Sequence, residues 1–368
     1  MKQTNFNICG FIGLGLIGGS IARAIKEHYP SMKLIAYDPD SNTLQQAMSC
    51  GVIDASASGI DETFSECDCI FLCAPVTDNA KNLKTLKKYI LKNCLLTDVG
   101  SVKTDIHHQI REAGLQDQFI GGHPMAGSER VGFINSKSLL LENAYYIITP
   151  EASVPVEAVT YFHDFVKSLG AIPMNMSYEE HDYVTAAISH LPHVVSASLV
   201  NLVAQSDSED GIMKTIAAGG FKDITRISSS SPAIWQQVCL TNKTNILLLL
   251  QRYIKSLEDI KGLIEQADKE EIYQFFQNAR EYRDSFINAS SGPIKKNYTV
   301  RVDIDDKPGA LAAVAGLLAA NHISIKNIGI VHNREQTDGV LQIELYHEDS
   351  ITSAIEVLKN KGYITYTP

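Results

Sequence analysis

The sequence predicts an α/β Rossmann-type parallel-sheet domain, followed by an all-α domain and a small βαββαβ ferredoxin-like domain. Three observations support this order. Apolar strands alternate with helical patterns over residues 1–176, helical spacing alone covers 177–291, and short strands return over 297–368. Ser290-Ser291-Gly292-Pro293 interrupts the last helical pattern, as a linker between domains would.

The first domain contains short apolar runs that predict strands, separated by helical patterns. These strands are expected over residues 7–12, 33–37, 69–74, 95–98, 119–121, 144–148 and 171–175. In an open α/β sheet, ligands bind at the carboxyl ends of the strands. We therefore expect the functional site along that edge of the sheet.

A glycine-rich turn follows the first predicted strand. Its sequence is Gly13-Leu14-Gly15-Leu16-Ile17-Gly18-Gly19, and a helical pattern begins directly after it. Gly13 allows a tight turn, Gly15 lets a pyrophosphate approach the backbone, and Gly18 lets the helix pack close to the strand. The turn and the first helical turn, residues 13–18, therefore predict a dinucleotide site.

Asp38 ends the second predicted strand, about twenty residues after the last glycine of the turn. Its carboxylate is expected to accept the ribose hydroxyls of the nucleotide. Pro39 and Asp40 follow, and no Arg or Lys stands there to receive a 2′-phosphate, so NAD rather than NADP is the expected cofactor. Ala74 and Pro75, at the end of the third predicted strand, are expected to line the same site.

Residues 177–291 carry apolar side chains at helical spacing. Helices are expected over 181–204, with an interruption at Pro192, and over 242–267 and 270–289. A helical domain with little sheet to cover buries its apolar faces against itself or against a second copy of the chain. We therefore expect a homodimer through this region.

The last domain has the βαββαβ order of a ferredoxin-like unit. Its strands are expected over 298–304, 323–331, 339–346 and 363–366, and its helices over 309–320 and 351–361. The first strand–helix turn, Asp306-Lys307-Pro308-Gly309-Ala310-Leu311, resembles the signature of the ACT family of amino-acid-sensing domains. That resemblance implies that such domains pair side by side and that a small amino acid binds near Asp306, Pro308, Gly309, Ala310 and Leu311. A structural appendage that binds no ligand is the alternative.

Composition narrows the class of protein further. Of the 368 residues, 45% are hydrophobic and 20% charged, and the net charge of −10 argues against binding to nucleic acid or to an anionic membrane. The apolar run 246–250 is too short to span a bilayer, and the chain begins with a strand rather than a targeting segment, so a cytoplasmic location is expected. Cys67, Cys69 and Cys73 straddle a strand whose alternate residues face opposite ways, so no metal site is expected.

A candidate catalytic histidine, His123, follows the fifth predicted strand. Glycines before it and a proline after it fix its backbone, so we expect it to face a cleft. An imidazole can accept a proton from a substrate hydroxyl while hydride leaves the carbon that bears this hydroxyl. Ser101, after the neighbouring strand, is expected to hydrogen-bond His123 or the nicotinamide side of the cofactor. A surface histidine and a helix N-cap are the respective alternatives.

Two further clusters are candidates for a polar pocket. Ser189 and His193 stand four residues apart in a predicted helix and so share a face; a core histidine is the alternative for His193. Arg226 lies in the glycine-bordered segment 219–227, and its guanidinium could bind a carboxylate, with Asp223 to orient it. A surface ion pair is the alternative for Arg226.

Taken together, the segments resemble the prephenate dehydrogenase family, of the monofunctional bacterial type with an ACT domain, over essentially the whole chain. The most specific matches are Gly122-His123-Pro124-Met125-Ala126-Gly127, Asp98-Val99-Gly100-Ser101-Val102-Lys103, Ser189-His190-Leu191-Pro192-His193 and Phe221-Lys222-Asp223-Ile224-Thr225-Arg226. The resemblance implies that His123 is catalytic, that Ser101 is its partner and that Arg226 anchors a substrate carboxylate. It implies pocket roles for Ser189, His193, Glu129, Gly219, Asp223 and Trp235, with Trp235 able to reach the site of the other subunit.

The resemblance also implies a reaction, the conversion of prephenate to 4-hydroxyphenylpyruvate, and tyrosine as the effector of the ACT domain. Arogenate dehydrogenase, whose substrate carries an amine in place of the keto group, remains an alternative. An amino-acid sensor built on an inactive dehydrogenase scaffold is another. A β-hydroxyacid dehydrogenase would carry a catalytic lysine in a glycine-rich motif of its helical domain, and Lys222 stands in a different context.

Overall fold

The structure, a computed structural model, describes residues 6–127, 130–288, 298–304, 307–331, 339–347 and 349–366. Its contacts divide the chain into two units, Met1–Gln266 and Ala267–Pro368. Glu129 and Asp306, both expected in binding sites, lie outside the described residues.

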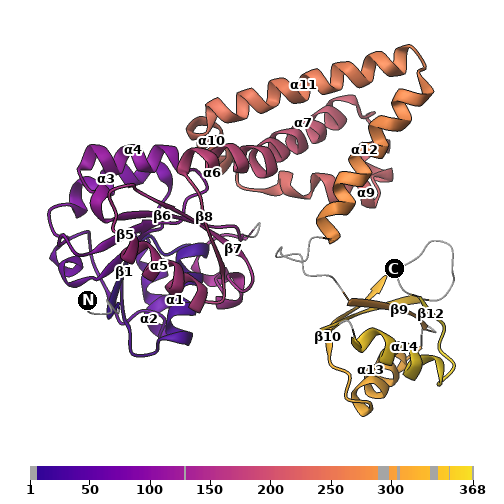
Figure 1. The fold of residues 1–368 in the computed structure, drawn as a ribbon, viewed down its shortest axis with the longest axis horizontal. Helices are drawn as coiled ribbons and strands as arrows, with labels where there is room; N and C mark the ends of the chain where they lie inside the picture. Colours follow the sequence, from indigo (N-terminus) through magenta and orange to yellow (C-terminus); the bar gives the residue numbers. More distant parts are fainter. Residues whose placement is uncertain are drawn as a thin grey trace. The chain divides into compact units, whose positions relative to one another are not determined.

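An eight-stranded sheet forms the centre of the first unit (Figure 1). In the order of the sheet, its strands are β3 (Ala55–Ser56), β2 (Lys33–Tyr37), β1 (Ile8–Ile12), β4 (Cys69–Leu72), β5 (Leu95–Asp98), β6 (Phe119–Pro124), β7 (Tyr145–Pro150) and β8 (Ile172–Asn175). Neighbouring strands from β3 to β6 are parallel, whereas β6 pairs with β7 antiparallel. The expected Rossmann-type sheet is confirmed; its last two strands run opposite to the other six, and β3 is a short edge strand that the sequence pattern did not indicate.

Helices cover both faces of this sheet (Figure 1). One face carries α1 (Leu16–His28), α2 (Ser41–Ser49) and α5 (Val156–Ser168), and the other carries α3 (Val76–Leu86) and α4 (Thr104–Ala113). Four short 3-10 helices lie in the connections: η1 (Glu62–Glu66), η2 (Gln116–Gln118), η3 (Phe133–Asn135) and η4 (Ser138–Leu140).

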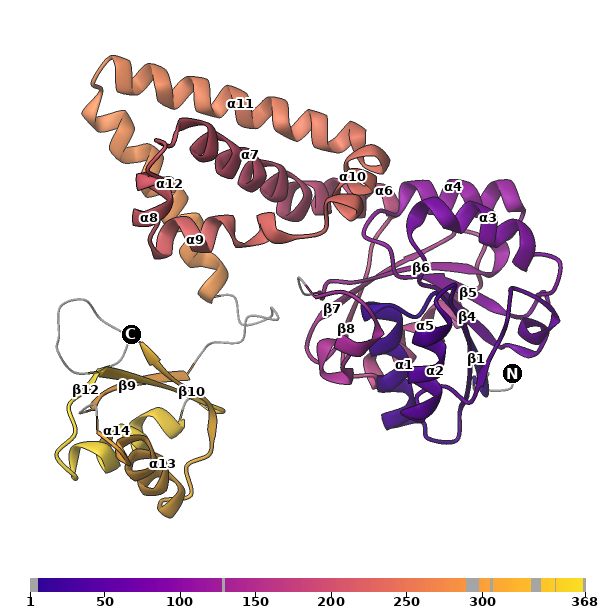
Figure 2. The same cartoon turned by 180° about the vertical axis from the view of Figure 1, so that it is seen from behind.

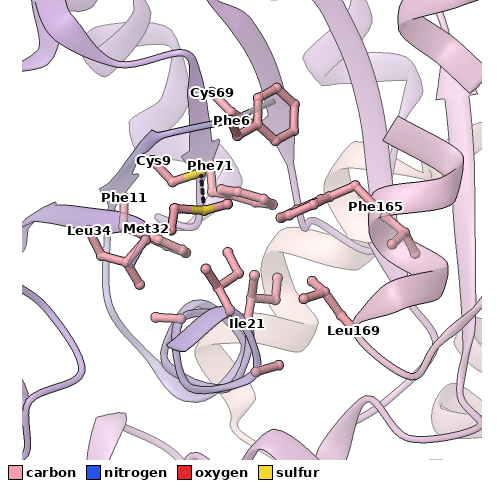
Figure 3. Packing of buried hydrophobic residues seen from close by; sticks show 14 of the residues in the cluster. Phe6, Cys9, Phe11, Ile21, Met32, Leu34, Cys69, Phe71, Phe165 and Leu169 are labelled. Carbon is pink, nitrogen blue, oxygen red and sulfur yellow. Dashed lines mark hydrogen bonds between the residues drawn. The ribbon is translucent and has the colours of Figure 1, made fainter. Parts of the chain in front are cut away.

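An apolar layer lies between the sheet and each set of helices. Figure 3 shows Ile21 of α1 and Phe165 of α5 beside strand residues that include Phe11 and Phe71. The rings of Phe11 and Phe71 stack with their centroids 5.0 Å apart. Burial of each such side chain contributes roughly 1.5–3 kcal/mol, and this packing holds the carboxyl ends of the strands in a fixed row.

The helical part of the first unit begins with one long, irregular helix. It consists of α6 (Tyr178–Thr185), a π-helical turn η5 (Ala186–His190) and α7 (Leu191–Ser206). Pro192 has no N–H to donate to the preceding turn, which accounts for the wider turn just before it. By length and composition, the stretch Tyr178–Ser206 is long and apolar enough to cross a membrane, and 17% of its most apolar window is buried within the single chain.

The chain then returns along α7 through short helices. These are α8 (Ile212–Ile216), α9 (Gly219–Thr225), η6 (Arg226–Ser229), α10 (Pro232–Thr241) and the long α11 (Lys243–Glu265). Helices α7 and α11 run side by side (Figure 2). The expected helical character of this region is confirmed.

The second unit contains α12 (Lys269–Asn288) and a βαββαβ domain. The domain consists of β9 (Tyr298–Ile304), α13 (Ala310–Ala320), β10 (Ile325–Val331), β11 (Gly339–Leu345), α14 (Asp349–Lys359) and β12 (Thr365–Tyr366). Its sheet is antiparallel, in the order β10-β11-β9-β12, and buried residues of α13 and α14 pack on it. The predicted ferredoxin-like order is confirmed.

Candidate functional site

The glycine turn between β1 and α1 is shaped by its glycines. Gly13 has a φ of +88°, and a Cβ on it would lie 2.7 Å from the backbone nitrogen of Ala74. A Cβ on Gly18 would lie 2.9 Å from the carbonyl oxygen of Gly13, so only a glycine lets α1 approach β1 this closely. By contrast, a Cβ on Gly15 would meet nothing within 4 Å. The space beside Gly15, at the N-terminus of α1, is therefore open to a ligand.

Asp38 follows β2 and lies beside this turn. Its Oδ2 accepts a hydrogen bond of 2.7 Å from the backbone N–H of Leu14, and its Oδ1 accepts one of 2.9 Å from that of Asp40. A carboxylate oxygen has two lone pairs, so both oxygens keep capacity for a hydroxyl donor. Ala74 and Pro75 follow β4 on the same edge of the sheet. The residues predicted to bind a dinucleotide are therefore brought together.

His123 lies inside β6 rather than after it, because the strand continues to Pro124 and pairs His123 with Ile147 of β7. Its side chain is half-buried. Its Nδ1 lies 2.8 Å from Nε2 of His181, in α6. Burial, and then the neighbouring His181 and Lys103, lower the pKa of His123 well below its usual value. His123 is therefore a neutral imidazole at neutral pH.

A buried ion pair fixes the backbone just before the histidine. Lys103 and Asp98 are almost fully buried, and Nζ of Lys103 binds Oδ2 of Asp98 and the carbonyl oxygen of Gly122, the latter at 2.7 Å. Asp98 also accepts hydrogen bonds from the backbone N–H groups of Gly100 (2.9 Å) and Gly122 (3.1 Å). The turn that carries Ser101, half-buried itself, is thereby tied to the strand that carries His123.

A second group of side chains gathers where η5, α7 and α10 meet. Nδ1 of His193 donates to the carbonyl oxygen of Ser189 at 2.8 Å, and the His193 ring stacks on Trp235 with centroids 3.6 Å apart. Burial and the charge of Arg226 lower the pKa of His193, although the hydrogen bond to Ser189 opposes them. The structure therefore brings Ser189, His193, Arg226 and Trp235 together within one chain.

His190 connects this group with His123. It is buried, and its Nδ1 accepts a hydrogen bond of 3.1 Å from Nδ2 of Asn242, which also donates to the carbonyl oxygen of Asp182 at 2.7 Å. Burial lowers the pKa of His190 to about 4. The charge of a protonated His190 would act on His123 and that of a protonated His193 on His190, so the histidines belong to one electrostatic neighbourhood.

Two other predicted pocket residues, Gly219 and Asp223, are exposed on α9. Within the described residues Asp223 forms no ion pair, so the expected orientation of Arg226 by Asp223 is not seen. Hydrogen bonds of Ser196 to the Ile224 carbonyl (3.1 Å) and to Ser228 Oγ (2.6 Å) fasten this segment to α7 instead.

Sequence reasoning missed His181, Asp182 and the role of His190. The first two stand among polar residues at the start of a helix and read as surface positions, but they are 0% and 1% exposed. Adjacent His and Asp in the helix that leads to Ser189 and His193 was the available signal. No group of three or more His, Cys, Asp or Glu that could hold a metal occurs in the part of the chain that the structure describes.

In the last domain, Gly309 has a φ of +91° and precedes α13, with nothing within 4 Å of a Cβ placed on it. Leu311, in the first turn of α13, is 43% exposed. Pro308, Gly309, Ala310 and Leu311 therefore form an accessible turn at the start of a helix, as expected.

Three family models match the chain. They describe the nucleotide-binding domain of prephenate dehydrogenase (residues 21–174), the dimerization domain of prephenate dehydrogenase (177–278) and the ACT domain (298–362). Among curated proteins, the chain is 40% identical to the prephenate dehydrogenase of Bacillus subtilis over 354 residues, which cover 95% of each chain.

Solved structures with the same fold include two dehydrogenases. A prephenate dehydrogenase from A. aeolicus, in complex with hydroxyphenyl propionate and NAD+, is 30% identical, with a TM-score of 0.73 over 77% of this chain and 100% of its own. An arogenate dehydrogenase from Synechocystis is 28% identical, with a TM-score of 0.68 over 76% of this chain and 99% of its own.

Proposed function

The chain belongs to the prephenate dehydrogenase family, and from that membership we propose that it catalyses the NAD-dependent oxidative decarboxylation of prephenate to 4-hydroxyphenylpyruvate. The observation that carries the proposal is the position of His123. It lies at the edge of the sheet formed by the carboxyl ends of the parallel strands, which also holds the glycine turn and Asp38. Burial keeps its imidazole neutral. A neutral imidazole beside a dinucleotide site can act as the base of a hydride-transfer reaction.

The residues present fit NAD. The open space at Gly15 admits a pyrophosphate to the N-terminus of α1, where the amides of Leu16, Ile17 and Gly18 point outward. Asp38 offers its remaining lone pairs to ribose hydroxyls, and its negative charge repels a 2′-phosphate. When bound, NAD+ supplies the hydride acceptor.

His123 receives the proton of the substrate hydroxyl through Nε2, because His181 occupies Nδ1. Removal of that proton from the hydroxyl group and of hydride from the carbon that bears it makes a carbonyl. The ring carboxylate then leaves as carbon dioxide, its bonding electrons make the ring aromatic, and the resulting phenolate oxygen takes the proton back from His123. Arg226 binds a carboxylate of the dianion, and Ser189 and His193 line the pocket. Ser101 hydrogen-bonds His123 or the nicotinamide side of the cofactor, and Trp235 covers His193.

The test measures NADH absorbance with prephenate or arogenate, each with NAD+ or NADP+. Turnover with prephenate and NAD+ is expected. Activity with arogenate alone would replace the substrate and leave the roles of His123 and Arg226 intact; the similarity to an arogenate dehydrogenase makes this the second candidate. No activity with either substrate would favour an amino-acid sensor on an inactive scaffold.

We also propose that the chain is a homodimer through its helical region. Leu202 of α7, Leu240 of α10 and Leu247 of α11 are 59%, 68% and 52% exposed, and a dimerization-domain model matches this region. A second copy is the occupant that would cover these side chains in water. Light scattering during gel filtration should give about twice the mass of one chain, which is 40.4 kDa.

We propose a cytoplasmic location for the protein. Thiols stay reduced there, which fits the seven free cysteines.

We propose that tyrosine binds the turn at residues 308–311 and inhibits the enzyme. Calorimetry with tyrosine on the full chain should show binding, which Gly309→Ala should weaken by straining the turn. Gly362→Ala is the matched control, since Gly362 has a φ of +85° and equal space around it. Equal binding by both variants would place the effector elsewhere.

A further inference from the structure

Two buried residues, His181 and Asp182, form a hydrogen-bonded row with the candidate base His123. Nδ1 of His123 lies 2.8 Å from Nε2 of His181, and Nδ1 of His181 lies 2.8 Å from Oδ1 of Asp182. His181 and Asp182 are 0% and 1% exposed, so water does not compete for these bonds. The row begins in β6 and ends in α6.

The charge state of Asp182 decides which atom donates and which accepts in each hydrogen bond of the row. Burial alone would raise its pKa, but hydrogen bonds from His181 and from Thr104 and Lys103 outweigh it and lower the pKa. The backbone N–H groups of Lys103 and Thr104 donate to Oδ1 and Oδ2 at 2.7 and 2.8 Å. Asp182 is therefore an ionised carboxylate, which accepts hydrogen bonds and donates none.

The positions of the protons follow from that carboxylate. Nδ1 of His181 must carry a proton to donate to Asp182. Burial lowers the pKa of His181, so its ring is neutral and its Nε2 has no proton. Nε2 of His181 must therefore accept from Nδ1 of His123. A neutral His123 with a proton on Nδ1 has a free lone pair on Nε2.

We propose that His181 and Asp182 are positioning residues that hold His123 in the tautomer whose Nε2 is the proton acceptor. The tautomer is inferred from the hydrogen bonds; its use in catalysis rests on the proposed function. The row also keeps the ring in place when His123 gains a proton on Nε2 during the reaction, because its Nδ1–H stays bonded to Nε2 of His181.

The other titratable groups around His123 do not fix its tautomer in this way. Lys103 and Asp98, at the end of β5, form a buried pair whose charges offset each other. His190, in η5, accepts a hydrogen bond from Nδ2 of Asn242 at its Nδ1 and is neutral, with a pKa of about 4. Asp182 is thus the negative charge in this network without a buried cationic side chain bound to it.

Two variants of His181 separate the proposal from a merely structural role. His181→Gln can still present an amide oxygen to His123, at about the distance of the missing Nε2. His181→Leu fills similar space with no acceptor. We expect kcat to fall about 100-fold in the Leu variant, within the usual contribution of a general base, and clearly less in the Gln variant. The KM values for prephenate and NAD+ should hardly change. His108→Gln, at an exposed position of α4, controls for loss of a histidine.

The tautomer itself can be read by NMR without any substrate. Ring ¹⁵N shifts of His123, assigned by their loss in His123→Asn, should report a protonated Nδ1 and a bare Nε2 in the wild type and in His181→Gln. In His181→Leu the two tautomers should mix. A wild-type His123 with its proton on Nε2, or equal kcat losses in the Gln and Leu variants with intact folding by circular dichroism, would overturn the proposal. A wild type with the expected tautomer and no dehydrogenase activity would overturn the proposed function alone.

Discussion

Changing either of two glycines in the same turn to alanine should affect different properties: Gly13→Ala should lower stability, and Gly15→Ala should weaken NAD+ binding. Gly13 has a φ of +88°, and its Cβ would lie 2.7 Å from the Ala74 nitrogen and 2.9 Å from the Cys73 carbonyl carbon, both backbone atoms. Gly15 has a φ of −79° and open space around its Cβ. Gly13→Ala should therefore destabilise the fold, whereas Gly15→Ala should only reduce the space for a ligand.

The magnitudes follow from these contacts. For Gly13→Ala, a left-handed conformation costs about 1–2 kcal/mol and overpacking about 1–3 kcal/mol, or about 2–5 kcal/mol together. Each kcal/mol lowers the Tm of a domain of this size by about 2–4 °C. For Gly15→Ala we expect no loss of stability but a loss of about 1.4–2.8 kcal/mol in NAD+ binding, which is a 10- to 100-fold rise in Kd.

The assay pairs urea unfolding with calorimetric titration of NAD+ for each variant. Gly59→Ala is the control, since Gly59 has neither a positive φ nor a neighbour within 4 Å of its Cβ. Unchanged NAD+ affinity in Gly15→Ala would refute the placement of the pyrophosphate. Unchanged stability in Gly13→Ala would refute the argument from the close backbone contact.

Four further outcomes are expected. His123→Asn should lower kcat by about 10²–10⁴-fold and largely spare substrate binding, as steady-state kinetics will report. Arg226→Ala should mainly raise the KM for prephenate, because it removes a carboxylate contact made in both ground and transition states; an equal fall in kcat would contradict that role. Lys103→Met should cost about 3–5 kcal/mol in urea unfolding by leaving Asp98 buried and unpaired, and adding Asp98→Asn should recover part of that loss. Acid should destabilise the chain, because the pKa of His190 is about 4 in the folded state and 6.5 in the unfolded state. Below pH 6.5 the unfolded state therefore binds a proton that the folded state does not, and the free energy of unfolding falls by about 3 kcal/mol as the pH falls to 4. The free energy of unfolding in urea, measured from pH 7 to pH 4, should fall less in His190→Gln.

Much of the fold could be predicted because its signals are local. Strands β1, β2 and β5 were predicted within a residue of their bounds, since each is a short apolar run between turn residues. Helices α8, α9 and α10 were not predicted as elements. Their segments are short and largely exposed in a single chain, so they lack the periodic apolar face that marks a helix.

The candidate site divides in the same manner. The glycine turn, Asp38, His123 and Arg226 could be found from sequence because each residue type has a specific chemistry at that spacing. His181 and Asp182 were missed, because the one local signal, an adjacent His and Asp in that helix, does not distinguish a buried polar pair from an exposed one. Their burial results from the docking of α6 against the start of α4, where the backbone N–H groups of Lys103 and Thr104 meet the Asp182 carboxylate.

The sequence by itself determined the order of the main strands and of the Rossmann-type, helical and ferredoxin-like parts, and it predicted a dinucleotide turn and a candidate base, because turns, periodicity and side-chain chemistry are properties of neighbouring residues. Only the tertiary structure decided that His123 lies within a strand, that its Nδ1 meets His181, and that Trp235 stacks on His193. The two side-chain contacts join residues 58 and 42 positions apart in the chain, and the packing of whole elements decides which distant residues meet.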